Sequence, residues 1–130
     1  MEIFPAEVEA RMRVGARYAD LITEAFGTGP GRLRSPYVEP FNTSVFAQYT
    51  VEVDRRETVE AHLKAAGVPT AVHYPLPLHL QPVFAKLGLR EGSFPVSEAA
   101  ARRVISLPMH PYLTDEQQRT VVSALKAAVS

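Results

Sequence analysis

An alternating run of side chains from Ser44 to Val53 determines the fold class more firmly than any other part of the sequence. Val45, Ala47, Tyr49, Val51 and Val53 share one face, and Phe46, Gln48, Thr50 and Glu52 share the other. Successive side chains of a β-strand point to opposite faces, so this pattern predicts a half-buried strand. The apolar face of such a strand has to be covered by another layer, and the neighbouring sequence offers helices.

A long amphipathic helix is predicted before this strand. Pro5 suits the first turn of a helix, and Gly27 suits the position just after its end. Between them, apolar or small residues recur every three or four positions, at Phe4, Val8, Met12, Gly15, Ala19, Ile22 and Phe26. This spacing predicts one buried face on a helix of about five turns. The residues from Gly27 to Ser44 show no periodicity and predict a long loop.

A second helix is expected directly after the alternating strand. Asp54 and Glu57 have the spacing of a capping box, in which the first side chain caps the helix. This helix should bury Val59 and Leu63 and end at Gly67. It would place a second helical layer beside the strand.

Short elements fill the middle of the chain. Thr70 to Tyr74 predicts a short strand. Leu78 to Leu87 predicts a short helix, with Val83, Phe84 and Leu87 facing inward.

Two helices and a strand are predicted in the last third. Pro95 begins a helix that reaches about Arg103, and Val104 to Leu107 is a small apolar strand. Thr114 and Gln117 form a second capping-box pattern and begin the last helix. Its buried stripe is expected at Gln118, Val121, Val122, Leu125 and Val129.

The order of these elements predicts an α+β fold, or small α/β sandwich. It should hold one short, mostly antiparallel sheet of about three strands covered by helices. The 130 residues fit one domain, residues 1–130, or a piece of a larger one.

Composition excludes several classes of function. The chain has 14 Lys and Arg against 14 Asp and Glu, so it lacks the positive charge expected of a protein that binds nucleic acid or an anionic membrane. It has no cysteine, which excludes disulfides, zinc ribbons and a thiol nucleophile. No apolar run approaches the ~18–20 residues needed to cross a bilayer. We therefore expect no nucleic-acid or membrane partner.

The densest group of chemically useful side chains runs from His73 to His79, as His-Tyr-Pro-Leu-Pro-Leu-His. Its two prolines fix φ and favour extended conformations before them, so the predicted strand leads into a stiff corner. Such a corner could present the imidazole of His73 and the phenol of Tyr74 to a ligand, or it could be a structural turn with a capped histidine. The separation of His73 and His79 matches no standard metal-ligand spacing, so no metal site is expected. His110, between two prolines, is interpreted as a turn residue.

The residues do not supply a complete catalytic apparatus. The sequence contains no G-x-S-x-G motif and no phosphate-binding glycine-rich loop after a strand. Its three lysines, Lys64, Lys86 and Lys126, lie in predicted helices among polar neighbours. A lysine that forms a Schiff base needs a desolvated or cationic pocket, which these surroundings do not provide. No catalytic and no cofactor-binding residue is therefore expected in this chain.

Several segments together resemble a known enzyme family. They are Glu2 to Pro5, Asn42 to Thr50, Gly67 to Pro82 and Val104 to Thr114. In order and spacing they are similar to the DegT/DnrJ/EryC1/StrS sugar aminotransferases, pyridoxal-phosphate enzymes of fold type I. The similarity is strongest to members that aminate a 3-keto UDP-sugar for surface-polysaccharide biosynthesis, including the lipopolysaccharide O-antigen.

This resemblance implies that the chain is the C-terminal small domain of such an enzyme. The large domain would precede it and carry the Schiff-base lysine and the other residues that bind pyridoxal 5'-phosphate. The intact enzyme would be a cytoplasmic homodimer that transfers an amino group from glutamate to a keto-sugar nucleotide such as a UDP-sugar. His73 and Tyr74 match the family's His-Tyr-Pro segment, and with His79 they are expected to bind substrate. The isolated chain is expected to be inactive.

Two alternatives stay open. A free-standing α+β binding or interaction module would have the same elements without an enzymatic parent. The small domain of a related sugar dehydratase, which uses pyridoxal or pyridoxamine phosphate, would share the fold and differ in reaction. The cofactor residue that separates dehydratase from aminotransferase would lie outside this chain.

Overall fold

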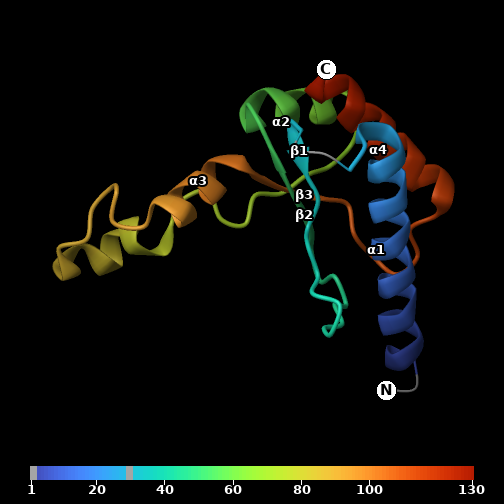
Figure 1. Ribbon diagram of the computed structural model, residues 1–130, viewed down its shortest axis with the longest axis horizontal. Helices are drawn as coiled ribbons and strands as arrows, with labels where there is room; N and C mark the ends of the chain where they lie inside the picture. The colour runs from blue at the N-terminus through green and yellow to red at the C-terminus, as the bar shows by residue number, and fades with distance from the viewer. Residues whose placement is uncertain (1–2, 29–30) are drawn as a thin grey trace.

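A three-stranded antiparallel sheet stands at the centre of the computed structural model, which describes residues 3–28 and 31–130 (Figure 1). The central strand β2 (Tyr49–Val53) pairs with β1 (Leu33–Arg34) on one side and with β3 (Val104–Leu107) on the other. Tyr49 lies opposite Leu107 and Val51 lies opposite Ile105, so these four side chains share one face of the sheet. The predicted α+β fold with a short antiparallel sheet is confirmed.

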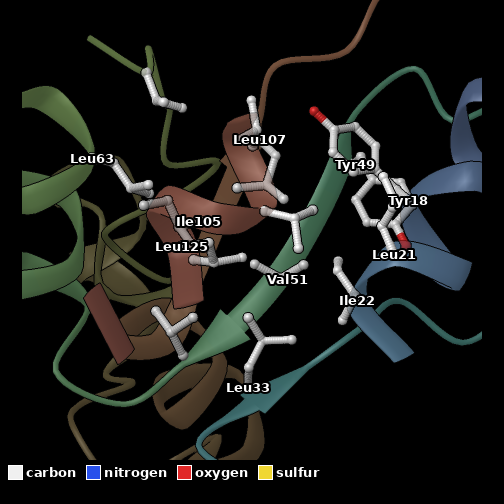
Figure 2. Packing of buried hydrophobic residues seen from close by; sticks show 14 of the residues in the cluster. Tyr18, Leu21, Ile22, Leu33, Tyr49, Val51, Leu63, Ile105, Leu107 and Leu125 are labelled. Atoms are coloured by element: carbon white, nitrogen blue, oxygen red, sulfur yellow. The ribbon is translucent and has the colours of Figure 1, made fainter. Parts of the chain in front are cut away.

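Three α-helices cover this apolar face. They are α1 (Phe4–Phe26), α2 (Arg56–Ala65) and α4 (Asp115–Val129). Figure 2 shows Tyr18, Leu21 and Ile22 of α1 turned toward Val51, with Leu63 and Leu125 in the same apolar cluster. The predicted stripe of α4 is buried throughout, from Gln118 to Val129. No helix in the described ranges is long and apolar enough to cross a membrane.

The buried face of α1 agrees with the predicted one only in part, since Gly15 and Ile22 are buried as predicted. Phe4 is 63% exposed and Met12 is 36% exposed, although both belong to the predicted stripe. The helix instead buries a neighbouring face centred on Tyr18, whose ring lies 4.8 Å from the ring of Tyr49 and whose hydroxyl donates to the carbonyl of Pro108. The spacing predicted that small residues face inward. The rotation of the helix is set instead by Tyr18, whose large ring is buried and whose hydroxyl has a hydrogen-bond partner.

The alternating segment becomes a strand only at Tyr49. Phe46 has a positive φ of 46°, which ends the extended conformation, and its ring lies against Gly15 of α1. The predicted loop 27–44 also contains β1, a strand that the sequence analysis missed. Residues 29–30 of that loop, residue 1, and Glu2 of the first family-like segment lie outside the described residues.

Of the two predicted capping boxes, one is confirmed and one is wrong. The Thr114 side chain accepts from the backbone of Gln117, and the Gln117 side chain accepts from the backbone of Thr114. At α2 the residue before the helix is Arg55, in a left-handed conformation, and no side chain caps it. Asp54 instead pairs with Arg103, 3.3 Å away, because that guanidinium competes for its carboxylate.

The segment between Ala71 and α3 (Pro95–Arg103) leaves the sheet (Figure 1). The predicted strand 70–74 is reduced to one bridge between Ala71 and Ser106, beyond which proline removes backbone donors. The predicted helix 78–87 is two short 3-10 helices, η1 (Leu78–Leu80) and η2 (Pro82–Leu87). We call residues 72–94 the arm; it projects to the left in Figure 1, away from α1 and α4.

The inward orientation predicted for the arm's apolar residues is wrong at two of the three positions. Val83 is 68% exposed and Leu87 is 59% exposed, whereas Phe84 is partly buried. Among the described residues, neither Val83 nor Leu87 belongs to the apolar cluster of the core, so both side chains face solvent. The turn predicted at His110 is present, with its carbonyl accepting from Leu113.

Candidate functional site

The His-Tyr-Pro corner and helix α3 face each other across a hollow of about 510 Å³. His73, Tyr74, Leu76, Pro77, Leu78 and Gln81 line it from the arm, and Ser97, Ala100, Ala101 and Val104 line it from α3 and the start of β3. The small side chains of α3 leave the space open, while the corner supplies an imidazole and a phenol. A volume of this size lies within the range of small-molecule sites.

His73 and Tyr74 stand at the mouth of this hollow. Their rings meet edge to face, with centroids 5.6 Å apart, and Tyr74 is 73% exposed. The bridge between Ala71 and Ser106 holds the chain to β3 two residues before His73, with backbone bonds of 2.7 and 3.2 Å. The corner therefore begins at a fixed point of the sheet and presents two polar rings outward, where they can meet a ligand.

His79 lies elsewhere. It is 8% exposed, it is absent from the lining of the hollow, and its Nε2 lies 3.0 Å from a carboxylate oxygen of Glu98. The ring of Phe94 packs against it edge to face at 4.9 Å. This geometry matches a histidine with a structural role, and the predicted contact of His79 with substrate stays a prediction.

Glu98 is the residue that the sequence analysis missed. Its carboxylate also accepts from the backbone N–H groups of Gly92 and Phe94, at 2.9 to 3.1 Å. The bond from Gly92 lowers the pKa of Glu98, supported by the bond from Phe94 and by His79 and opposed by burial. A signal was present, because Glu98 shares a helix face with the small apolar residue Ala101, three positions later.

A larger hollow of about 710 Å³ lies beside the ends of α1 and α4 and is lined by arginines. These arginines already have protein partners. Arg32 donates to the carbonyls of Val129 and Ser130, and Arg103 pairs with Glu52 and Asp54. Because its arginines are paired and none of the residues from His73 to His79 lines it, we take the smaller hollow beside His73 as the candidate site.

None of the three lysines has the surroundings of a lysine that holds a cofactor covalently. Lys64, Lys86 and Lys126 are all exposed, on α2, η2 and α4. A Schiff-base lysine requires a desolvated or cationic pocket, so these lysines do not fit. Within residues 3–28 and 31–130 no three His, Asp or Glu side chains gather in a way that could hold a metal ion.

Comparison with solved structures places this α+β fold among aminotransferases. A DegT DnrJ EryC1 StrS aminotransferase from Brucella abortus matches 99% of the chain with a TM-score of 0.85 and 32% identity, over 33% of its own chain. DesV from S. venezuelae, solved in complex with a ketimine intermediate, matches 97% of the chain with the same TM-score and identity, again over 33% of its own chain. NtdA from Bacillus subtilis, solved with bound cofactor PMP, matches 95% with a TM-score of 0.77 and 25% identity, over 28% of its own chain.

The amino-acid sequence identifies one family among these aminotransferases. The model of the DegT/DnrJ/EryC1/StrS aminotransferase family matches residues 1–126, and the chain belongs to that family. It is 48% identical to the UDP-2-acetamido-2-deoxy-3-oxo-D-glucuronate aminotransferase of Pseudomonas aeruginosa, over 96% of this chain and 32% of that protein. The chain thus spans about a third of the length of the relatives that it matches.

Proposed function

We propose that this chain is the C-terminal small domain of a nucleotide-sugar aminotransferase and forms one wall of its substrate pocket. The intact enzyme would transfer an amino group from glutamate to a keto-sugar nucleotide such as a UDP-sugar. The observation that carries the proposal is the hollow between His73, Tyr74 and α3, in a chain that belongs to this family.

The proposed cofactor, pyridoxal 5'-phosphate, would be held by the part of the enzyme outside this chain. The exposed lysines described above do not fit it, and the NtdA structure with bound PMP supports its use among relatives. The residues of this chain would bind and orient the substrate and exclude water from it.

The chemistry of the hollow suits a sugar ring. The Tyr74 hydroxyl can donate and accept, and the imidazole of His73 can do either according to its tautomer, so both can bond sugar hydroxyl or keto oxygens. Leu76 and Ala100 supply apolar surface that would exclude water beside those bonds. The tether of the corner to β3 would keep these groups in place before substrate arrives, which favours orientation. We further propose that a homodimer completes the site, as the resemblance implies.

The two half-reactions of the intact enzyme test this assignment. His73→Ala and Tyr74→Phe should weaken use of the keto-sugar nucleotide by about tenfold, which is the loss of one or two positioned hydrogen bonds. They should leave the glutamate half-reaction nearly unchanged. His62→Ala on α2 and Tyr37→Phe in the loop before β2 are matched controls, because both residues are exposed and outside the hollow. Equal losses in both half-reactions would contradict a role in binding sugar.

Isotope transfer separates the proposed reaction from its alternatives. An aminotransferase moves ¹⁵N from labelled glutamate into the sugar product, whereas a dehydratase releases water from the sugar without using glutamate. A free-standing binding module would do neither. Reading the gene upstream of the codon for Met1 gives an independent check, since an open frame with a lysine-bearing large domain is expected there.

A further inference from the structure

The arm, residues 72–94, is tied to the rest of the molecule by very few polar contacts. Its backbone hydrogen bonds join neighbours within the arm, such as Leu80 to Pro77 and Ser93 to Arg90. A further bond joins the backbone N–H of Arg90 to the hydroxyl of Ser93 inside the arm. Among the hydrogen bonds of the described residues, every bond that leaves the arm ends on Glu98. Glu98 alone therefore forms the hydrogen bonds that attach the 23 residues of the arm to α3.

Glu98 reaches both ends of the arm at once. Its carboxylate accepts from His79 near the beginning of the arm and from Gly92 and Phe94 at its end. The bond from its backbone N–H to the carbonyl of Phe94 is the first helical bond of α3, so the side chain alone makes the link to His79. The side chains of His79 and Glu98 are 7% and 6% exposed, so water does not compete freely for these bonds.

The turns of α3 that contain Glu98 also form the far wall of the hollow. Ser97, Ala100 and Ala101 line this wall. Glu98, next to Ser97, bonds to His79 of the arm, and the arm forms the opposite wall of the hollow. Among the described residues, the bridge between Ala71 and Ser106 is the other hydrogen-bonded contact that fixes the start of the arm. We propose that Glu98, through His79, is a positioning residue that fixes the His73–Tyr74 wall against α3, a role that rests on the function proposed above.

We call the hydrogen bonds between the Glu98 side chain and the arm the grip, and these bonds require a carboxylate. Two backbone N–H groups point at its oxygens, and because an ionised carboxylate only accepts, the Nε2 of His79 carries the proton it shares. A glutamine at this position would turn an amide NH₂ toward one of these donors. Glu98→Gln therefore keeps the size of the side chain and breaks its hydrogen-bond pattern.

Limited trypsin digestion of the 130-residue chain tests the grip without reference to activity. The arm carries two exposed trypsin sites, Lys86 and Arg90. Cleavage there should be about tenfold faster in Glu98→Gln than in the parent, because proteolysis follows the population of the open arm. Glu24→Gln is the matched control, since Glu24 is exposed on α1 and adjoins neither cleavage site. His79→Gln, which leaves the Gly92 and Phe94 bonds, should give an intermediate rate and replaces Glu98→Gln if that variant does not fold. Equal cleavage in parent and variants would overturn the grip.

Kinetics of the intact enzyme test the positioning. In Glu98→Gln the KM for the keto-sugar nucleotide should rise about tenfold, while the glutamate half-reaction stays within about twofold. General destabilisation would lower both half-reactions together. Faster cleavage of the arm with an unchanged KM would overturn the positioning role. If the parent enzyme showed no glutamate half-reaction, the proposed function would be overturned, while the digestion result would still hold.

Discussion

The arm and the layered part of the molecule are held in different ways. The layered part, which we call the body, consists of α1, α2, α4 and the sheet. It buries its leucines, as at Leu125 with no exposed surface, whereas Leu87 in the arm is 59% exposed. The body is specified by many apolar contacts, and the arm is attached through one carboxylate.

This difference implies that stability and site geometry can be changed separately. Burial of apolar surface sets the free energy of unfolding, so changes in the body should appear in denaturation. The arm adds little buried surface, so changes there should alter its local opening and leave global unfolding almost unchanged. The candidate substrate wall lies on the weakly held side of this division.

The sharpest contrast comes from shortening one leucine in each region. Leu125→Ala should lower the free energy of unfolding by about 3 kcal/mol, since it leaves a cavity at a fully buried position. Leu87→Ala should cost less than about 0.5 kcal/mol because most of that side chain is already in water. Urea denaturation measures both. A cost above about 1 kcal/mol for Leu87→Ala would mean that the arm belongs to the body.

A methyl group added to α1 should destabilise the body by steric contact. A Cβ at residue 15 would lie 2.3 Å from Cδ2 of Phe46 and 2.8 Å from its Cγ, so the whole ring would have to move. Gly15→Ala should therefore cost about 2 kcal/mol in urea denaturation, even though alanine is the better helix former. In the background of Phe46→Ala, the same change should become stabilising by about 0.5 kcal/mol or more. An equal cost in both backgrounds would exclude the ring as the cause.

Removing the cap of α4 should weaken the body and leave the arm alone. Thr114→Ala loses the bond to the backbone of Gln117 and should cost about 1 kcal/mol. Asp54→Ala is the comparison, because Asp54 has the same spacing pattern but caps no helix and should cost less. Trypsin cleavage at Lys86 and Arg90, measured well below the unfolding transition, should be unchanged by Thr114→Ala. Faster cleavage there would show that the two regions are coupled.

The sequence predicts the body well because periodicity reports burial. The alternation at Tyr49, Val51 and Val53 and the stripe of α4 were each readable from side-chain type alone. It failed where a single tertiary contact decided the outcome. Tyr18 set the rotation of α1, and Arg103 drew Asp54 away from a capping position.

The candidate site was predictable only in part. His73 and Tyr74 were singled out because they stand at a proline-rich corner and match a family motif, and they do line a hollow. That Ser97 and Ala100 face them could not be read from spacing, because the arm returns to α3 over some 20 residues without a periodic pattern. The role of Glu98 was not predicted for a related reason, since one of its partners, His79, lies 19 residues earlier in the chain.

The pH dependence of the arm should follow Glu98, with the smallest effect on global unfolding. Its pKa is lowered in the folded chain by the bond from Gly92, so the carboxylate stabilises the attached arm at pH values above the ordinary glutamate pKa of about 4.5. That contribution should disappear as the pH falls below this value and the folded-state carboxylate takes up a proton. The amide proton shifts of Gly92 and Phe94 should report the titration, with a midpoint below 4.5. In Glu98→Gln these shifts should lose the transition, and Glu91→Gln should retain it. A midpoint at or above 4.5 in the parent would mean that the grip does not favour the ionised carboxylate, and that the arm is held by the packing of Phe94 on His79 instead.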